Sequence, residues 1–96
     1  MAAPPVLGTL ESSLYAPDLG AAERFYAGTL GLPVIGRQEG RHVFFRVGGS
    51  ILLVFDPEAT AHPPRPDAKL PVPAHGASGP GHYCFAVDAG TLADWR

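Results

Sequence analysis

The sequence contains little cysteine and little charge of either sign. Cys84 is the single cysteine among 96 residues, so no disulfide can form within the chain, and nothing favours secretion. Seven Lys and Arg stand against nine Asp and Glu, and the most basic five-residue window contains only Arg37 and Arg41. Nucleic acids and anionic membranes require clustered cations, so neither is expected as a partner.

Long hydrophobic runs are also missing. The longest extends from Ile51 to Phe55, far short of the roughly 20 apolar residues that span a bilayer. The first residues, Met-Ala-Ala-Pro-Pro, contain neither the basic segment nor the apolar segment of a signal peptide. These absences predict a cytoplasmic protein.

Glycine and proline, by contrast, are abundant, with 12 and 11 residues. Seven of the eleven prolines lie within 57–80, so the excess belongs to one long connection. The chain is 46% hydrophobic and 17% charged, a composition that excludes wholesale disorder. Its length allows one domain, which we expect to occupy 1–96.

The clearest local pattern before the connection is that of a helix following a strand. Apolar and polar residues alternate over 9–16, although imperfectly, and this alternation predicts a strand. Asp18 is suited to cap a helix over 19–30. That helix has an apolar stripe at three- and four-residue spacing. Gly31 and Pro33 then end it.

Three further strands are predicted over 33–38, 41–47 and 50–56, the last two joined by a Gly48-Gly49 hairpin turn. In the middle one, alternation separates two faces. Val43, Phe45 and Val47 lie on one face, and His42, Phe44 and Arg46 lie on the other. The strand over 50–56 is apolar on both faces, which is typical of a central strand.

After the connection a second unit begins, with a strand predicted over 81–88 and the start of a helix over 89–96. The fold class is therefore α+β: a complete strand–helix–strand–strand–strand module at about 9–56, followed by the first strand and helix of another. A single four-stranded sheet would leave one apolar face in water. We therefore expect a second copy to cover it.

Two motifs indicate a family. D-L-x-x-A-x-x-F-Y-x-x-x-L-G-L at 18–32, followed by R-H-V-F-F-R-V-G-G-S-I-L-L-V-F-D-P at 41–57, resembles the vicinal oxygen chelate superfamily. That superfamily includes glyoxalase I, extradiol dioxygenases, fosfomycin-resistance transferases, methylmalonyl-CoA epimerase and bleomycin-binding proteins. The run G-P-G-H-Y-C-F-A-V-D at 79–88 reinforces the likeness. The resemblance implies a mixed sheet that curves into a cup, and it specifies the fold more closely than the activity.

The resemblance also implies where a divalent metal ion would bind. The ligand positions are the first inward residue of each module's first strand, here Glu11 and His82, and a residue midway along each module's last strand. In the first module that last position is Leu53, which cannot bind metal. Members with three ligands leave this position empty, and the third ligand would then lie beyond Arg96. Zinc, nickel, manganese and iron are not distinguished.

Other residues are candidates for the substrate pocket because they share a predicted face with these positions. Arg46 is suited to bind an anionic substrate, Tyr15 to donate a hydrogen bond, and Cys84 to pack rather than react, since no neighbouring base is evident. His75, in the proline-rich connection, is expected to be an exposed loop residue. The full pocket set is Tyr15, His42, Phe44, Arg46, Leu53, Phe55 and Cys84.

Two functions remain open. The first is a metal-dependent lyase, transferase or dioxygenase that chelates a small oxygen-rich substrate and acts on it as a Lewis acid. The second is a metal-free protein that sequesters a planar ligand, as bleomycin-resistance proteins do. With little more than one module per chain, both predict a homodimer, with exchanged strands or modules as one form of it.

Overall fold

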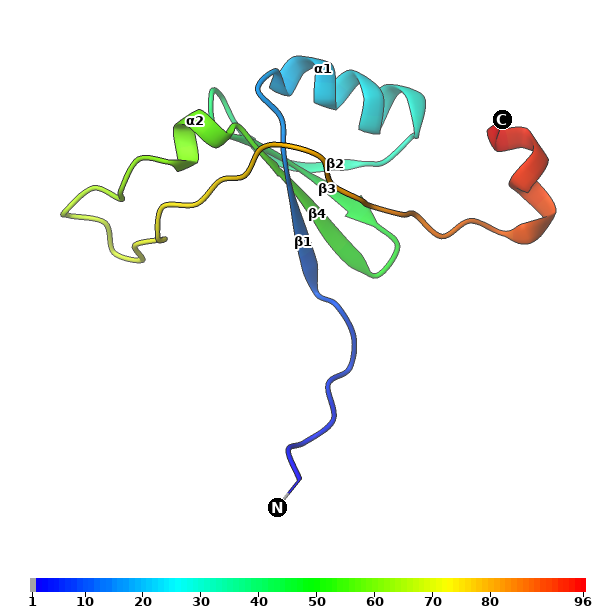
Figure 1. Cartoon of the computed structure of the whole chain (residues 1–96), viewed down its shortest axis with the longest axis horizontal. Coiled ribbons are helices and arrows are strands. Elements are labelled where there is room, and N and C mark those ends of the chain that lie inside the picture. The colour runs from blue at the N-terminus through cyan, green and yellow to red at the C-terminus, as the bar shows by residue number, and fades with distance from the viewer. Residues whose placement is uncertain (1) are drawn as a thin grey trace.

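The computed structural model describes residues 2–96, and its centre is a four-stranded mixed sheet (Figure 1). The strands are β1 (Glu11–Tyr15), β2 (Val34–Gln38), β3 (His42–Val47) and β4 (Ser50–Phe55), in the order β1-β4-β3-β2. β1 runs parallel to β4, whereas β4 with β3 and β3 with β2 are antiparallel. The predicted strand–helix–strand–strand–strand order is confirmed.

The predicted helix over 19–30 is also present, as an α-helical segment followed directly by a π-helical one. α1 (Leu19–Glu23) begins where the Asp18 carboxylate accepts a hydrogen bond from the Ala21 amide at 3.0 Å. It continues as a π-helical segment, η1 (Arg24–Thr29), in which the Leu30 amide donates to the Phe25 carbonyl at 3.0 Å. Gly31, at φ +76°, then turns the chain out of the helix, as its sequence position predicts.

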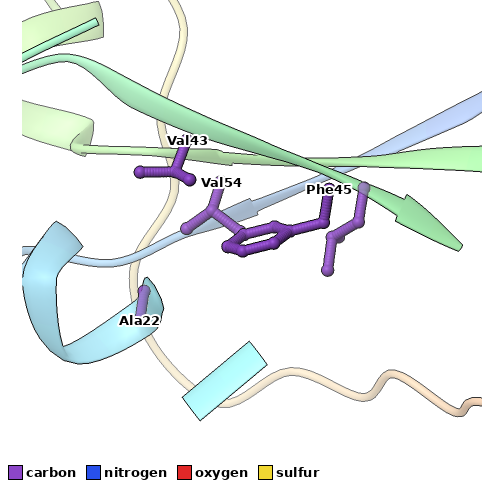
Figure 2. Packing of buried hydrophobic residues seen from close by; sticks show 5 residues of the cluster. Ala22, Val43, Phe45 and Val54 are labelled. Atoms are coloured by element: carbon purple, nitrogen blue, oxygen red, sulfur yellow. The ribbon is translucent and has the colours of Figure 1, made fainter. Parts of the chain in front are cut away.

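The hydrophobic core lies between this helix and one face of the sheet. Phe45, Leu52 and Val54 are fully buried, and Val43 and Ala22 are nearly so. Figure 2 shows the β3 and β4 side chains directed toward Ala22 of α1. The apolar alternation of 41–47 therefore identifies the helix-facing side of β3 correctly.

The opposite side of the sheet, which we call the open face, carries the remaining side chains in three rows. Strand register pairs Tyr15 with Phe55 and Phe55 with His42 in one row, and Ser13 with Leu53 and Leu53 with Phe44 in the next. The third row consists of Glu11, Ile51 and Arg46. All the pocket candidates predicted within the first module thus share one face of the sheet.

The proline-rich connection begins with a short helix that the sequence analysis did not predict. α2 (Pro57–Thr60) starts at Asp56, whose carboxylate accepts from the Glu58 amide at 3.0 Å. Thr60 is buried, and its carbonyl accepts a hydrogen bond from the His75 amide at 2.9 Å. This bond brings the far end of the connection back to the sheet.

The predicted strand over 81–88 is wrong. These residues make no strand pairing, and the chain leads across them to η2 (Ala89–Trp95), a 3-10 helix where the start of a helix was predicted (Figure 1). A strand is completed by backbone hydrogen bonds from a neighbour. Here the recorded link to β1 is a side-chain one, between the Ser12 and Tyr83 hydroxyls at 2.6 Å.

The molecule is open rather than compact. Its solvent-accessible area is 7535 Å², whereas a folded monomer of this mass exposes about 5300 Å². Its radius of gyration is 15.9 Å, against about 12.5 Å for a compact domain of this length. Within residues 2–96, no helix is long and apolar enough to cross a membrane.

Candidate functional site

One end of the open face is organised around the ring of Phe55, which is only 6% exposed although it lies on the side of the sheet away from the α1 core. Five side chains surround it, and together with Phe55 we call them the Phe55 cluster. The ring centroids of His75, Phe44, His42 and Tyr15 lie 4.7, 5.7, 5.8 and 6.2 Å from that of Phe55, and the Arg41 guanidinium carbon lies 5.4 Å from it. The apolar side chain of Phe55 is therefore surrounded mainly by residues with polar groups.

His42 is fixed in orientation within this cluster. Its ring stacks on Phe44 at 4.1 Å with an interplanar angle of 9°. The Arg41 Nη1 lies 2.7 Å from the His42 Nδ1, and because a guanidinium only donates, Nδ1 accepts and the neutral ring carries its proton on Nε2. Partial burial, and after it the charge of Arg41, lower the pKa of His42 below its usual 6.5. The imidazole is thus a neutral hydrogen-bond donor.

Tyr15 is held by the connection. Its hydroxyl lies 2.8 Å from the His75 Nδ1, and the His75 ring packs edge-on against Phe55. His75 is half-buried, so the expectation of an exposed loop histidine is wrong. The hydrogen bond from the His75 backbone amide to the Thr60 carbonyl holds the His75 ring against the open face. The ring thereby contacts Tyr15, which is 60 residues away in the sequence.

The other end of the open face is exposed. Glu11 and Arg46 are both accessible, on either side of Ile51. Neither forms an ion pair with any residue in 2–96. Leu53, in the middle row between Ser13 and Phe44, adds an apolar surface between the two ends.

His82 and Cys84 lie outside the sheet. The His82 Nε2 is 3.2 Å from the Cys84 Sγ, and both residues are exposed. The interpretation of Cys84 as a packing residue without a neighbouring base is therefore corrected: the thiol is exposed beside an imidazole, because 81–88 has no partner strand to cover it. Nowhere among residues 2–96 do three His, Cys, Asp or Glu side chains gather closely enough to hold a metal ion.

The sequence model of the glyoxalase/bleomycin resistance protein/dioxygenase superfamily matches residues 7–94. The chain belongs to this superfamily. The resemblance drawn from the motifs at 18–32, 41–57 and 79–88 is thereby confirmed.

A solved structure in the glyoxalase superfamily supports the same assignment. The chain is similar to the crystal structure of lactoylglutathione lyase from Agrobacterium tumefaciens, with 43% sequence identity and a TM-score of 0.80. The similarity covers 95% of this chain and 66% of the lyase chain, so this chain spans just under two thirds of that protein's length. No curated protein sequence matches it.

Sequence reasoning missed two residues of the Phe55 cluster. Arg41 directly precedes β3 and has no distinctive spacing, so its contact with Phe55 is visible only once β3 and β4 are paired. His75 depends on the fold of the connection. One signal could have indicated Arg41: it directly precedes His42 in the run 41–47, where apolar and polar residues alternate clearly.

Proposed function

We propose that the open face is one wall of a glyoxalase-type active site, whose other wall is a second copy of this module or the remainder of a longer chain. The observation that favours this most is the contrast between the two faces of the sheet. One is filled by α1, whereas the other presents Tyr15, His42 and Glu11, with His75 of the connection packed at its Phe55 end. The likeness to a lactoylglutathione lyase supports a lyase acting on a small oxygen-rich substrate.

Metal dependence is part of the proposal only for the completed site. Glu11 offers an accessible carboxylate, a suitable oxygen ligand for a divalent ion. The described residues of one chain do not fit a metal site, because they bring no three ligands together and the His82 ring contacts Cys84 instead of Glu11. The further ligands must therefore come from the second wall.

The test pairs two carboxylate substitutions. In Glu11→Gln, bound metal and turnover of lactoylglutathione are both expected to fall at least a hundredfold, since the amide removes the anionic ligand. Glu39→Gln makes the same charge change at an exposed turn between β2 and β3 and serves as the control. Elemental analysis per chain and thioester absorbance provide the two readouts. Equal metal content and turnover in both variants would refute the role of Glu11.

A second candidate function is supported by Leu53 and the aromatic rings beside it. Leu53 and Phe44, both half-buried, form an apolar strip on the open face beside the buried Phe55 ring, suited to a planar ligand held without metal. This metal-free sequestering function predicts tight binding of an aromatic probe that is unchanged by a strong chelator. The enzyme proposal predicts instead that chelation abolishes turnover.

A further inference from the structure

Arg41 is a positioned cation with no acidic partner. Its guanidinium lies over the Phe55 ring, and one of its nitrogens donates to His42 at 2.7 Å. These two contacts hold the group in one place. Its remaining N–H groups are not engaged by any side chain within residues 2–96.

Two other arginines of the chain, unlike Arg41, each lie close to an acidic side chain. Arg37 pairs with Glu23 at 2.8 Å, and Arg65 approaches Asp67 at 3.9 Å. Asp56 lies beside Arg41, since its amide donates to the Arg41 carbonyl, but its carboxylate accepts from the Glu58 amide. Arg41 is only partly exposed, and a partly buried charge is unfavourable unless it is paired.

We propose that Arg41 and His42 form a subsite for the carboxylate of a small ligand with an apolar or aromatic body. The guanidinium fork matches a carboxylate, and one arm remains available for it after the bond to His42. The neutral His42 ring adds an N–H donor without adding a second cation. Phe44, half-buried and stacked on His42, supplies apolar surface next to these donors.

This subsite deepens the proposed function by giving the charge of the substrate, and it rests on that proposal only in taking the open face as the binding wall. It lies in the row containing Phe55 and His42, at the opposite end of the face from Glu11. A ligand would thus be oriented by its carboxylate at one end of the face and would present its other end to Glu11.

The experiment uses benzoate as the probe, on chain kept in chelator so that no metal takes part. Amide NMR titration is expected to give saturable shifts at His42 and Phe55. Arg41→Gln is expected to weaken benzoate binding roughly tenfold, as the loss of a hydrogen bond to a charged group does. Arg24→Gln, the same change at an exposed residue of η1 on the other side of the sheet, is the matched control and is expected to change it less than twofold.

Benzyl alcohol, which lacks the carboxylate, is expected to bind equally to the native chain and to Arg41→Gln. Arg41→Lys guards against misfolding, and we expect it to recover part of the affinity because it restores the charge without the fork. Equal weakening by Arg41→Gln and Arg24→Gln, or no saturable shift at His42, would overturn the subsite. Benzoate binding that depends on Arg41, in a protein that neither takes up metal nor turns over lactoylglutathione once the chelator is removed, would support the subsite and refute the enzyme proposal.

Discussion

Individual side chains at the Phe55 end of the open face are held by one another. Arg41 and Phe44 fix the His42 ring, while His75 fixes the Tyr15 hydroxyl, and all of them pack around one buried ring. Groups held in this way lose little freedom when a ligand binds, which favours specific recognition. Their arrangement depends on which protonation state His42 adopts.

The pH dependence of stability tests that state. Because the folded-state pKa of His42 is lowered, the unfolded chain binds the proton more tightly, and the free energy of unfolding falls as the pH drops below about 6.5. The loss continues until the folded-state pKa is reached, and above pH 6.5 this residue contributes no slope. In His42→Gln, chemical denaturation across this range should show a shallower decline. An unchanged slope would mean that His42 is not protonated differently in the two states.

Among the secondary-structure elements, those specified by local signals were predictable. Asp18 and Gly31 delimit the helix, and the alternation of 41–47 assigns the faces of β3. The short helix α2 does have a local start signal, the cap Asp56 followed by Pro57, which the sequence analysis did not use. The placement of His75 depends instead on its bond to Thr60, which no local pattern predicts. The prediction of a strand over 81–88 was wrong for a related reason. The sequence of these residues is suited to a strand, but in the structure they do not pair with a neighbouring strand.

For the candidate site, the sequence located the shared face of Tyr15, His42, Phe44, Leu53 and Phe55 through the period of two along strands. It could not locate Arg41, whose role depends on cross-strand contacts. The ligand roles of Glu11 and His82 came from the family resemblance and remain predictions.

The packing of α1 on the sheet predicts a strong contrast between two phenylalanines. Phe45 is fully buried beneath α1, so Phe45→Ala is expected to reduce the free energy of unfolding by about 3–5 kcal/mol. Phe25, which lies in η1 and is 49% exposed, is the control, and Phe25→Ala should cost about 1 kcal/mol or less. Urea denaturation followed by circular dichroism measures both. Similar losses in the two variants would show that the core is not where the structure places it.

At the scale of the whole molecule, the exposed surface exceeds that of a compact monomer by roughly 2200 Å². Large apolar side chains contribute to it: Tyr83, Phe85, Leu92 and Trp95 of the last segment are all more than a third exposed. A surface of this size and character favours burial against another module. We therefore propose that two copies of the chain meet so that each open face is enclosed.

The central claim, that the open face is half of a site completed by a second module, is tested most directly by native mass spectrometry of the chain with added zinc. The account predicts a species of twice the chain mass that carries bound metal, and loss of the metal from that species in Glu11→Gln. A monomer at every concentration, with no metal uptake, would contradict the account.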